Sequence, residues 1–237
     1  MKCPAGTGRA GFPEIAADML AKDQILFSDN HLLAVSKPGG LLTQPSGTTE
    51  DSIEAQAREW VKREFNKPGA VFLEAVHRID REVSGVVLFA RTSKALSRLN
   101  EQIRDRKTRK IYHALIEQAL PKKAGTLTHW LIHGDHRALV GCETDPDAKQ
   151  AVLHYRVLGT AWKMWLIEIQ LETGRYHQIR AQLAAEGCPI AGDAKYGAKR
   201  RFAENTIALH HRQLEIVHPV KHTVMVITAP YPAAWPS

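Results

Sequence analysis

The stretch HRIDREVSGVVLFAR, residues 77–91, places a group of charged residues directly before an apolar run. Asp80 stands between Arg78 and Arg81, and residues 86–89 have the composition of a buried strand. A charged loop rooted in apolar strands is a natural position for an active site, because rigid scaffolds carry functional loops. An ordinary salt-bridged turn accounts for the same residues, so their spacing alone does not decide between the two interpretations.

On both sides of this stretch, predicted strands outnumber predicted helices. Helices are expected over the apolar stripe of residues 53–65, after Thr92 or Ser93, and around residues 179–183. The expected strands cover residues 25–27, 31–35, 72–76, 86–89, 110–116, 151–157, 164–171, 207–216 and 224–229. Two of them, 151–157 and 164–171, form an antiparallel pair joined through Gly159, and residues 121–147 are predicted to form hairpins and loops.

These strands do not alternate regularly with helices. The pattern favours an α+β fold, with a largely antiparallel mixed central sheet and flanking helices and loops, over a doubly wound fold. The chain has 237 residues, 44% of them hydrophobic, which is enough for a substantial core. We expect a loose N-terminal segment over residues 1–24, rich in Gly, Ala and Pro, and one domain over residues 25–237.

Several sequence features bear on the cellular compartment. The longest apolar runs fall far short of the ~20 residues that a membrane-spanning helix needs, so no membrane partner is expected. The three cysteines are widely spaced, which indicates a reducing compartment without a structural disulfide. The N-terminus lacks the hydrophobic region of a secretory signal. We therefore expect a cytoplasmic protein, with a monomer as the default oligomeric state.

The positive charge is unevenly distributed. The formal net charge is +7, which favours a polyanionic partner. Residues 98–110 contain six basic and two acidic side chains, a local charge of +4, and residues 195–201 hold a second basic cluster. Such segments suit phosphate contacts. The C-terminal end of a solvated helix also favours Lys and Arg, so charge alone leaves both interpretations open.

A second segment of interest is GRYHQIR, residues 174–180. It places two arginines, a tyrosine and a histidine just before or within a predicted helix, whose N-terminus adds a partial positive charge. Arg180 falls on an otherwise apolar stretch, where a guanidinium requires a carboxylate partner, and Asp80 is a candidate for that partner. A surface helix with a basic start remains the alternative.

Three histidines, His129, His133 and His136, have a spacing that superficially resembles a metal site. No cysteine or HExxH pattern lies near them, and their segment lacks helical periodicity. We therefore expect no metal there. The pair His210 and His211 falls in a late predicted strand, where a structural role is expected.

At this point the residues support a family resemblance. The chain resembles the RluA-type pseudouridine synthases in five blocks that keep the family's order and extend over nearly the whole chain from residue 25. The blocks are ILFSDNHLLAVSKPGGLL (25–42), HRIDREVSGVVLFAR (77–91), RKIYHALI (109–116), TGRYHQIRAQLAAEGCPIAGDAKYG (173–197) and LHHRQLEIVHP (209–219). Only about 24 residues precede the first block, so we expect the catalytic domain without the accessory S4 RNA-binding domain.

The resemblance implies the pseudouridine synthase fold and isomerisation of uridine to pseudouridine in structured RNA, with rRNA and tRNA both possible. It implies no cofactor and no metal. It makes Asp80 the catalytic aspartate, Tyr112 the residue that stacks on the target base, and Arg180 the ion-pair partner of the aspartate. The RNA contacts that we expect are Arg78, Arg81, Arg106, Lys107, Arg109, Lys110, Arg175, His177, Gln178 and Leu183, of which Arg78 helps to displace the flipped base and Leu183 lines the pocket.

Three positions depart from the family pattern. Val83 and Tyr176 stand where Thr is common, and Gln182 stands where His is common. None of these changes removes an expected catalytic group. Two mechanisms stay open for Asp80, attack at C1′ of the ribose or removal of the C2′ proton to form a glycal. The competing hypothesis is a noncatalytic RNA-binding protein that keeps the synthase scaffold.

Overall fold

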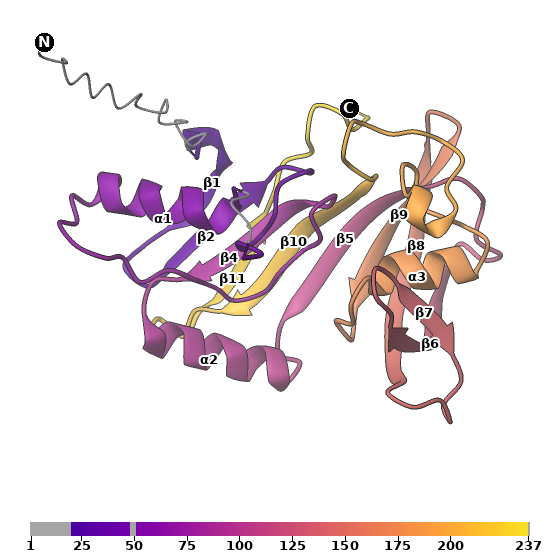
Figure 1. Ribbon diagram of the computed structural model, residues 1–237, viewed down its shortest axis with the longest axis horizontal. Helices are drawn as coiled ribbons and strands as arrows, with labels where there is room; N and C mark the ends of the chain where they lie inside the picture. Colours follow the sequence, from indigo (N-terminus) through magenta and orange to yellow (C-terminus); the bar gives the residue numbers. More distant parts are fainter. Residues whose placement is uncertain (1–19, 48–50, 237) are drawn as a thin grey trace, which may run out of the picture.

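The computed structural model describes residues 20–47 and 51–236 and places one long, bent sheet at the centre of the protein (Figure 1). Its helices are α1 (Ile53–Glu64), α2 (Ser93–Arg104) and α3 (Gln178–Ala185), with short 3₁₀ helices η1 (Lys22–Gln24) and η2 (Ala194–Tyr196). Its strands are β1 (Ile25–Ser28), β2 (Leu32–Lys37), β3 (Glu74–Ala75), β4 (Ser84–Ala90), β5 (Arg109–Ile116), β6 (Ala124–His133), β7 (Ala138–Gly141), β8 (Lys149–Ala161), β9 (Met164–Leu171), β10 (Leu209–Val217) and β11 (Val224–Thr228).

The strand order is β1-β2-β4-β10-β5-β9-β8-β6-β7, with β3 paired to β4 and β11 paired to β10. Every pair among these strands is antiparallel except β4 with β10. The predicted α+β class and the largely antiparallel mixed sheet are therefore confirmed. No helix among the described residues is both long and apolar enough to cross a membrane.

Helices cover both faces of one half of the sheet. In β2, Leu33 and Val35 pack into the core cluster that contains the buried side chains of α1, whereas Leu32 and Ala34 pack into the cluster beneath α2. Figure 1 accordingly shows α1 and α2 on opposite sides of β2 and β4. A strand covered on both faces reads as a continuous apolar run, which explains why β2 and β4 are evident in the sequence.

The centre of the sheet depends on a close approach between β4 and β10. Their short parallel pairing sets His210 beside Ser84 and His211 beside Gly85. Gly85 has φ +118°, and a Cβ at this position would lie 2.3 Å from the carbonyl oxygen of His211. Only glycine fits such an approach at that φ. The Asp80 loop therefore ends directly above the junction of β4, β10 and β5.

The structure differs from the sequence expectations at several points. Gly159 does not join β8 to β9; it lies within β8 at an irregularity, and Trp162 and Lys163 form the turn with φ of 51° and 59°. Two positive φ values match the twist of a tight hairpin, so the β8–β9 turn does not require glycine. The strand expected over residues 72–76 shrinks to β3, and residues 121–147 contain the hairpin of β6 and β7.

The N-terminal segment is only partly described. Residues 1–19 of the expected loose segment lie outside the described residues. Leu20, which belongs to the same expected segment, is buried in the large core cluster, and η1 follows it. The segment that packs on the core therefore begins earlier than residue 25.

Candidate active site

A cavity of about 1050 Å³ lies over the centre of the sheet. Its lining comes from the loop 76–83, from Lys110 and Tyr112 on β5, from residues 174–179 before and in α3, and from Lys195. The Asp80 side chain opens into it and is 26% exposed. The fold thus brings Asp80 and Arg180, which are 100 residues apart in the chain, into contact.

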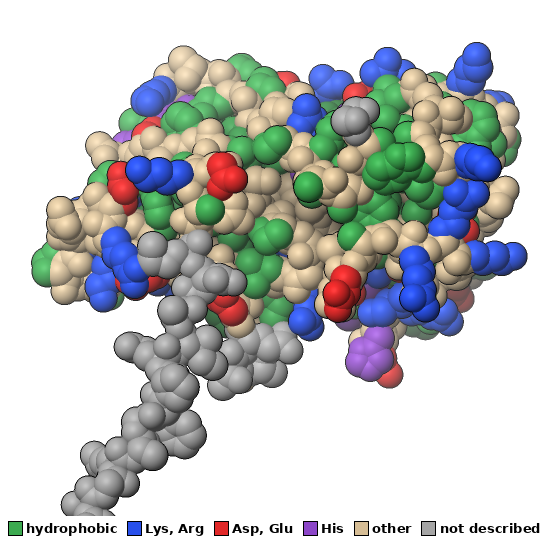
Figure 2. Space-filling model, turned by 90° about the horizontal axis from the view of Figure 1, so that it is seen from above, with side chains coloured by type: hydrophobic (Ala, Val, Ile, Leu, Met, Phe, Trp, Pro, Cys, Tyr) green, Lys and Arg blue, Asp and Glu red, His purple; other side chains and the backbone are tan. Residues whose placement is uncertain are grey.

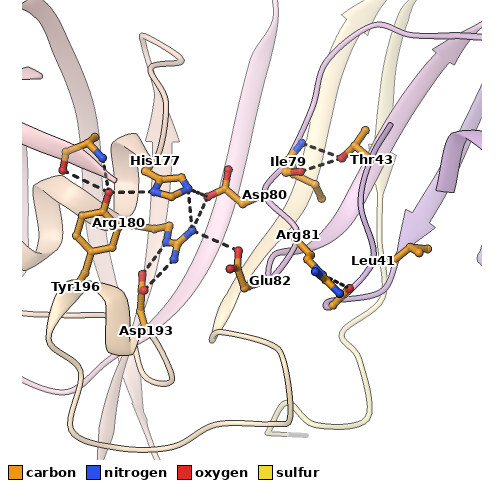
Figure 3. Close-up of polar contacts among 12 residues, drawn as sticks. Leu41, Thr43, Ile79, Asp80, Arg81, Glu82, His177, Arg180, Asp193 and Tyr196 are labelled. Atoms are coloured by element: carbon orange, nitrogen blue, oxygen red, sulfur yellow. Dashed lines mark hydrogen bonds and ion pairs between the residues drawn. The ribbon is translucent and has the colours of Figure 1, made fainter. Parts of the chain in front are cut away.

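Arg180 is the centre of the polar network at the cavity floor (Figure 3). Its guanidinium is only 2% exposed, and Nη1 lies 3.0 Å from Oδ2 of Asp80. The other side of the guanidinium donates from Nε and Nη2 to the two carboxylate oxygens of Asp193, at 2.7 and 2.9 Å. This bidentate contact fixes the plane of the guanidinium, so that Nη1 points at Asp80. The predicted contact between Asp80 and Arg180 is confirmed.

The electrostatics keep this arginine charged. Burial alone would lower the pKa of Arg180, but the hydrogen bonds and charge of Asp193, together with the charge of Asp80, raise it above its ordinary value. A permanent positive charge therefore lies beside the carboxylate of Asp80. Asp193 is itself 1% exposed, so the two side chains compensate each other's buried charge.

Glu82 and His177 complete the surroundings of the aspartate. Oε2 of Glu82 lies 3.4 Å from Nη1 of Arg180, and Nε2 of His177 lies 3.1 Å from the same nitrogen and 3.6 Å from Oδ2 of Asp80. Nδ1 of His177 is 3.0 Å from the hydroxyl of Tyr196. Burial lowers the pKa of His177, so a neutral ring faces the cavity at physiological pH.

Tyr112 forms the opposite wall of the cavity. Its ring is buried and stacks on His211, with the ring centroids 4.4 Å apart and the planes 13° apart. Burial raises the pKa of the phenol well above its ordinary value, and the charge of Asp80 raises it further. The hydroxyl therefore keeps its proton at neutral pH. His211 covers one face of the ring, so a ligand in the cavity can stack only on the other face.

The loop that carries Asp80 is clamped from below. The buried Nζ of Lys37 donates to the carbonyl oxygens of Pro38, Leu41 and Arg81, at 2.8, 2.6 and 3.1 Å. Thr43 donates its hydroxyl to the carbonyl of Ile79 at 2.8 Å. Burial lowers the pKa of Lys37 to about 7. These contacts fix the backbone on both sides of Asp80, so the carboxylate is positioned before any ligand arrives.

Most of the expected RNA contacts lie at the cavity. Six of them line it: Arg78, Arg81, Lys110, Arg175, His177 and Gln178. The amide of Gln178 is used within the protein, since its Oε1 accepts from the backbone amide of Arg175 and its Nε2 donates to the carbonyl of Val152. Its place at the wall therefore serves to shape the loop before α3.

The remaining four expected contacts lie outside the lining. Arg106, Lys107 and Arg109 are exposed beyond the end of α2 and make surface contacts with acceptors on neighbouring segments. Exposed pairs of this kind contribute little, so these cations remain able to exchange partners for phosphates. Leu183 is fully buried in the core and does not line the cavity. The expected pocket contact of Leu183 is wrong, because its side of α3 faces the sheet.

Sequence reasoning missed the second carboxylate partner. Asp193 lies 13 residues beyond Arg180, in the turn before η2, and no helical or strand periodicity relates the two positions. The available signal was composition: an arginine buried by apolar neighbours needs full neutralisation, and one aspartate at the cavity surface does not supply it. Tyr196, three residues beyond Asp193 in η2, was also missed, because no periodicity relates it to His177, whose ring its hydroxyl contacts.

Surface charge extends beyond the cavity. Figure 2 shows Lys and Arg side chains gathered on the drawn face at the end of the molecule that carries β6, β8, β9 and α3. This is the half of the molecule that supplies Arg180 and the residues before α3. Positive charge gathered at one end of the molecule favours contact with a polyanion there.

Comparison with known proteins identifies the family. The model of the RNA pseudouridylate synthase family matches residues 31–185. An uncharacterized RNA pseudouridine synthase of Bacillus subtilis is 34% identical over 212 residues, which cover 88% of this chain and 68% of that protein. Ribosomal large subunit pseudouridine synthase C of Buchnera aphidicola is 32% identical and covers 90% of this chain and 68% of its own length.

Solved structures agree at the level of the fold. Human RNA pseudouridylate synthase domain containing 4 superposes with a TM-score of 0.74 at 24% identity, over 88% of each chain. The family match, the relatives and the fold all agree with the RluA-type resemblance of the five sequence blocks. The chain therefore belongs to the RNA pseudouridine synthase family and is an isomerase.

Proposed function

We propose that this synthase isomerises specific uridines in structured RNA through Asp80, after the target nucleotide has been flipped into the cavity. The observation that carries the proposal is the carboxylate of Asp80 at the cavity surface, with Arg180 at 3.0 Å and Asp193 behind it. A charged acid at the floor of a cavity large enough for a nucleotide is what chemistry at the ribose requires.

The reaction breaks the N1–C1′ bond, turns the uracil and joins C5 to C1′. The proton on C5 is lost and N1 regains one, so the product is an isomer of the substrate. Asp80 either attacks C1′ or takes the C2′ proton to give a glycal, and both routes need an ionised carboxylate. Arg180 places a positive charge beside this carboxylate. Water must stay away from the sugar, which the partly buried position of Asp80 favours.

The walls of the cavity suit an extruded base. Flipping a nucleotide out of folded RNA costs a few kcal/mol of unstacking. Stacking on the free face of Tyr112 offsets roughly 1–3 kcal/mol of that cost. Arg78 is exposed at the mouth of the cavity, where a guanidinium replaces the departed base or contacts a phosphate. The half-buried Lys110 adds positive charge on the side of Tyr112.

Ribosomal RNA is the substrate class that we propose first, because relatives such as the Buchnera protein are named as synthases of the large ribosomal subunit. Transfer RNA is the alternative. Mapping pseudouridines across the RNA of cells with and without this protein identifies the site: we expect one or a few positions in ribosomal RNA to lose pseudouridine. Loss confined to transfer RNA would replace ribosomal RNA with the alternative.

Release of tritium from C5-labelled uridine in that RNA tests the catalytic role. The wild type is expected to release label, and Asp80→Asn is expected to release none while it still binds the RNA. Arg180→Met, which leaves Asp80 without its cation, is expected to lose most activity. An active Asp80→Asn variant would refute the assignment of the aspartate, and a wild type that binds RNA without releasing label would support the noncatalytic alternative.

A further inference from the structure

A stack of three rings leads from the catalytic aspartate to the rim of the cavity. His177, beside Asp80, stacks on Tyr176 with centroids 3.9 Å apart and planes 21° apart. Tyr176 in turn meets His133, the last residue of β6, at 4.3 Å and 32°. Two rings this close cannot share one face of the phenol, so they cover its opposite faces.

The outer end of this stack is open. His133 and Tyr176 both line the cavity and both are exposed, Tyr176 to 38%. His177, at the inner end, is buried. No ring partner beyond Tyr176 contacts His133 among the described residues. The face of His133 that points away from Tyr176 is therefore an aromatic surface at the mouth of the cavity.

The histidine is not explained by metal binding. Of the three histidines with suggestive spacing, His129 contacts Gln182 and Glu186 instead. Residues 20–47 and 51–236 contain no group of three His, Cys, Asp or Glu side chains that suits a metal ion. A stacked, exposed ring at a nucleotide-sized cavity is better matched to a planar ligand.

Cations flank the stack. Arg175 precedes Tyr176 and Lys195 precedes Tyr196, and both are exposed at the cavity rim. Nε of Arg175 donates to the carbonyl of Gln150, which anchors the stem of the side chain close to the stack. Aromatic faces interleaved with cations are the usual means by which proteins hold unpaired nucleotides, because bases stack while phosphates pair with the cations.

We propose that the outer face of His133, supported by Tyr176 and His177, is a stacking site for an unpaired base next to the target uridine, with Arg175 and Lys195 near the flanking phosphates. This inference rests on the proposed function. The stack holds the neighbour of the uridine while Tyr112 holds the uracil, so the strand is spread between two platforms. Tyr176 is the middle ring of the stack, because it contacts both His133 and His177.

A KM-against-kcat comparison tests the site. The substrate is total RNA labelled with tritium at C5 of uridine, prepared from cells that lack this protein. His133→Ala is expected to raise KM by about 5- to 100-fold, the equivalent of one lost stacking contact, with a smaller effect on kcat. His133→Phe keeps an aromatic face and is expected to restore KM. His136→Ala, an exposed histidine beyond β6, is the matched control.

Three results would overturn the inference: an unchanged KM in His133→Ala, a loss confined to kcat, or a failure of His133→Phe to restore KM. A loss confined to kcat would instead mean that the stack only positions His177. These results are distinct from failure of the proposed function, which shows as a wild type that releases no tritium.

A binding measurement tests the stacking site even if the wild type releases no tritium. In the Asp80→Asn background, a short oligouridylate with 2-aminopurine beside its central uridine is expected to lose fluorescence on binding, because the probe stacks on His133. The His133→Ala change in the same background is expected to abolish that quenching. Equal quenching in both proteins would exclude the stacking site.

Discussion

At the scale of single residues, Asp193 sets the position of the guanidinium that faces the carboxylate of Asp80. Its two hydrogen bonds to Arg180 lie within a region from which water is excluded. Asp193→Asn keeps the size of the side chain but removes its charge and one acceptor. We expect the free energy of unfolding to fall by about 3–5 kcal/mol, because a buried cation loses its partner.

Activity is expected to fall as well in Asp193→Asn. A small displacement of Arg180 displaces Asp80, and a misplaced catalytic group can cost roughly 100-fold in rate. Urea unfolding and the tritium assay measure the two effects separately. Glu172→Gln, which breaks an exposed pair with Arg106, is the control and is expected to change stability by less than about 1 kcal/mol. Normal kinetics in Asp193→Asn would show that Asp80 alone orients Arg180.

Lys37 is a second residue outside the cavity whose substitution is expected to disturb the loop that carries Asp80. Lys37→Met removes the ammonium group that donates to three backbone carbonyls, those of Pro38, Leu41 and Arg81. We expect a loss of roughly 3 kcal/mol in unfolding free energy. Hydrogen exchange at the amide of Gly40, which donates to the carbonyl of Arg81, should become faster. Lys67→Met, an exposed lysine after α1, is the matched control, and equal exchange in both variants would contradict the clamp.

The sequence located the acid and its nearest cation but not the rest of the network. The contact between Asp80 and Arg180 could be predicted because Arg180 lies on an apolar stretch of a predicted helix, where a buried guanidinium needs a carboxylate. Asp80, in a charged loop between apolar strands, is a candidate for that carboxylate. Leu183 was misplaced because the sequence does not show which side of α3 faces the sheet. The ring stack of His133 and Tyr176 required the β6–β7 hairpin to fold back on the loop before α3, which no local pattern specifies.

At the scale of secondary-structure elements, the close pairing of β4 with β10 leaves no room for a side chain at Gly85. Gly85→Ala places a Cβ 2.3 Å from a backbone oxygen of β10 at a φ of +118°. We expect a loss of several kcal/mol, or failure to fold, since backbone cannot move aside as a side chain can. Thermal unfolding measures this change.

Gly159→Ala is the matched control for that prediction. A Cβ at Gly159 meets nothing within 4 Å, and its φ is not in the left-handed region. The change should leave stability within about 0.5 kcal/mol of the wild type, or raise it slightly. Equal stability of the two alanine variants would mean that β4 and β10 can separate without harm to the fold.

Strands with a clear hydrophobic pattern were predicted well, and strands whose pattern is irregular were not. The strands β2 and β4 read as apolar runs because both of their faces are covered. In β6 only Leu127 and Leu131 are well buried, so its ten residues lack clear alternation and appear as part of a turn-rich region. The glycine in β8 suggested a turn because composition cannot distinguish a glycine at a strand irregularity from one in a hairpin.

At the scale of the whole molecule, stability should depend on pH through the buried histidines at the centre of the sheet. Burial lowers the pKa of His210 to about 4 and that of His211 to about 3, from an ordinary 6.5. Below pH 6.5 these two histidines therefore bind protons in the unfolded chain but remain neutral in the folded protein. Stability is full above pH 6.5 and falls as the pH drops toward 4, by about 1.4 kcal/mol per pH unit for each histidine.

Urea unfolding between pH 6.5 and 4.5 measures this slope. The pKa of Asp29 is lowered to about 2, so its titration lies below the window. His210→Gln is expected to reduce the slope by about 1.4 kcal/mol per pH unit. His136→Gln, an exposed change, should leave the slope as in the wild type. A flat profile in the wild type would show that the folded protein takes up protons at these histidines.

The order in which the strands are made differs from their order in space. β10 occupies the middle of the sheet, between β4 and β5, yet it is translated after all but one of the other described strands. On the ribosome, the segment with Asp80 emerges long before the strand that must separate it from Tyr112. An unfinished polypeptide consequently holds the acid without an assembled site around it. We therefore expect a chain that is still being synthesised to be inactive on the RNA around it until β10 has been translated.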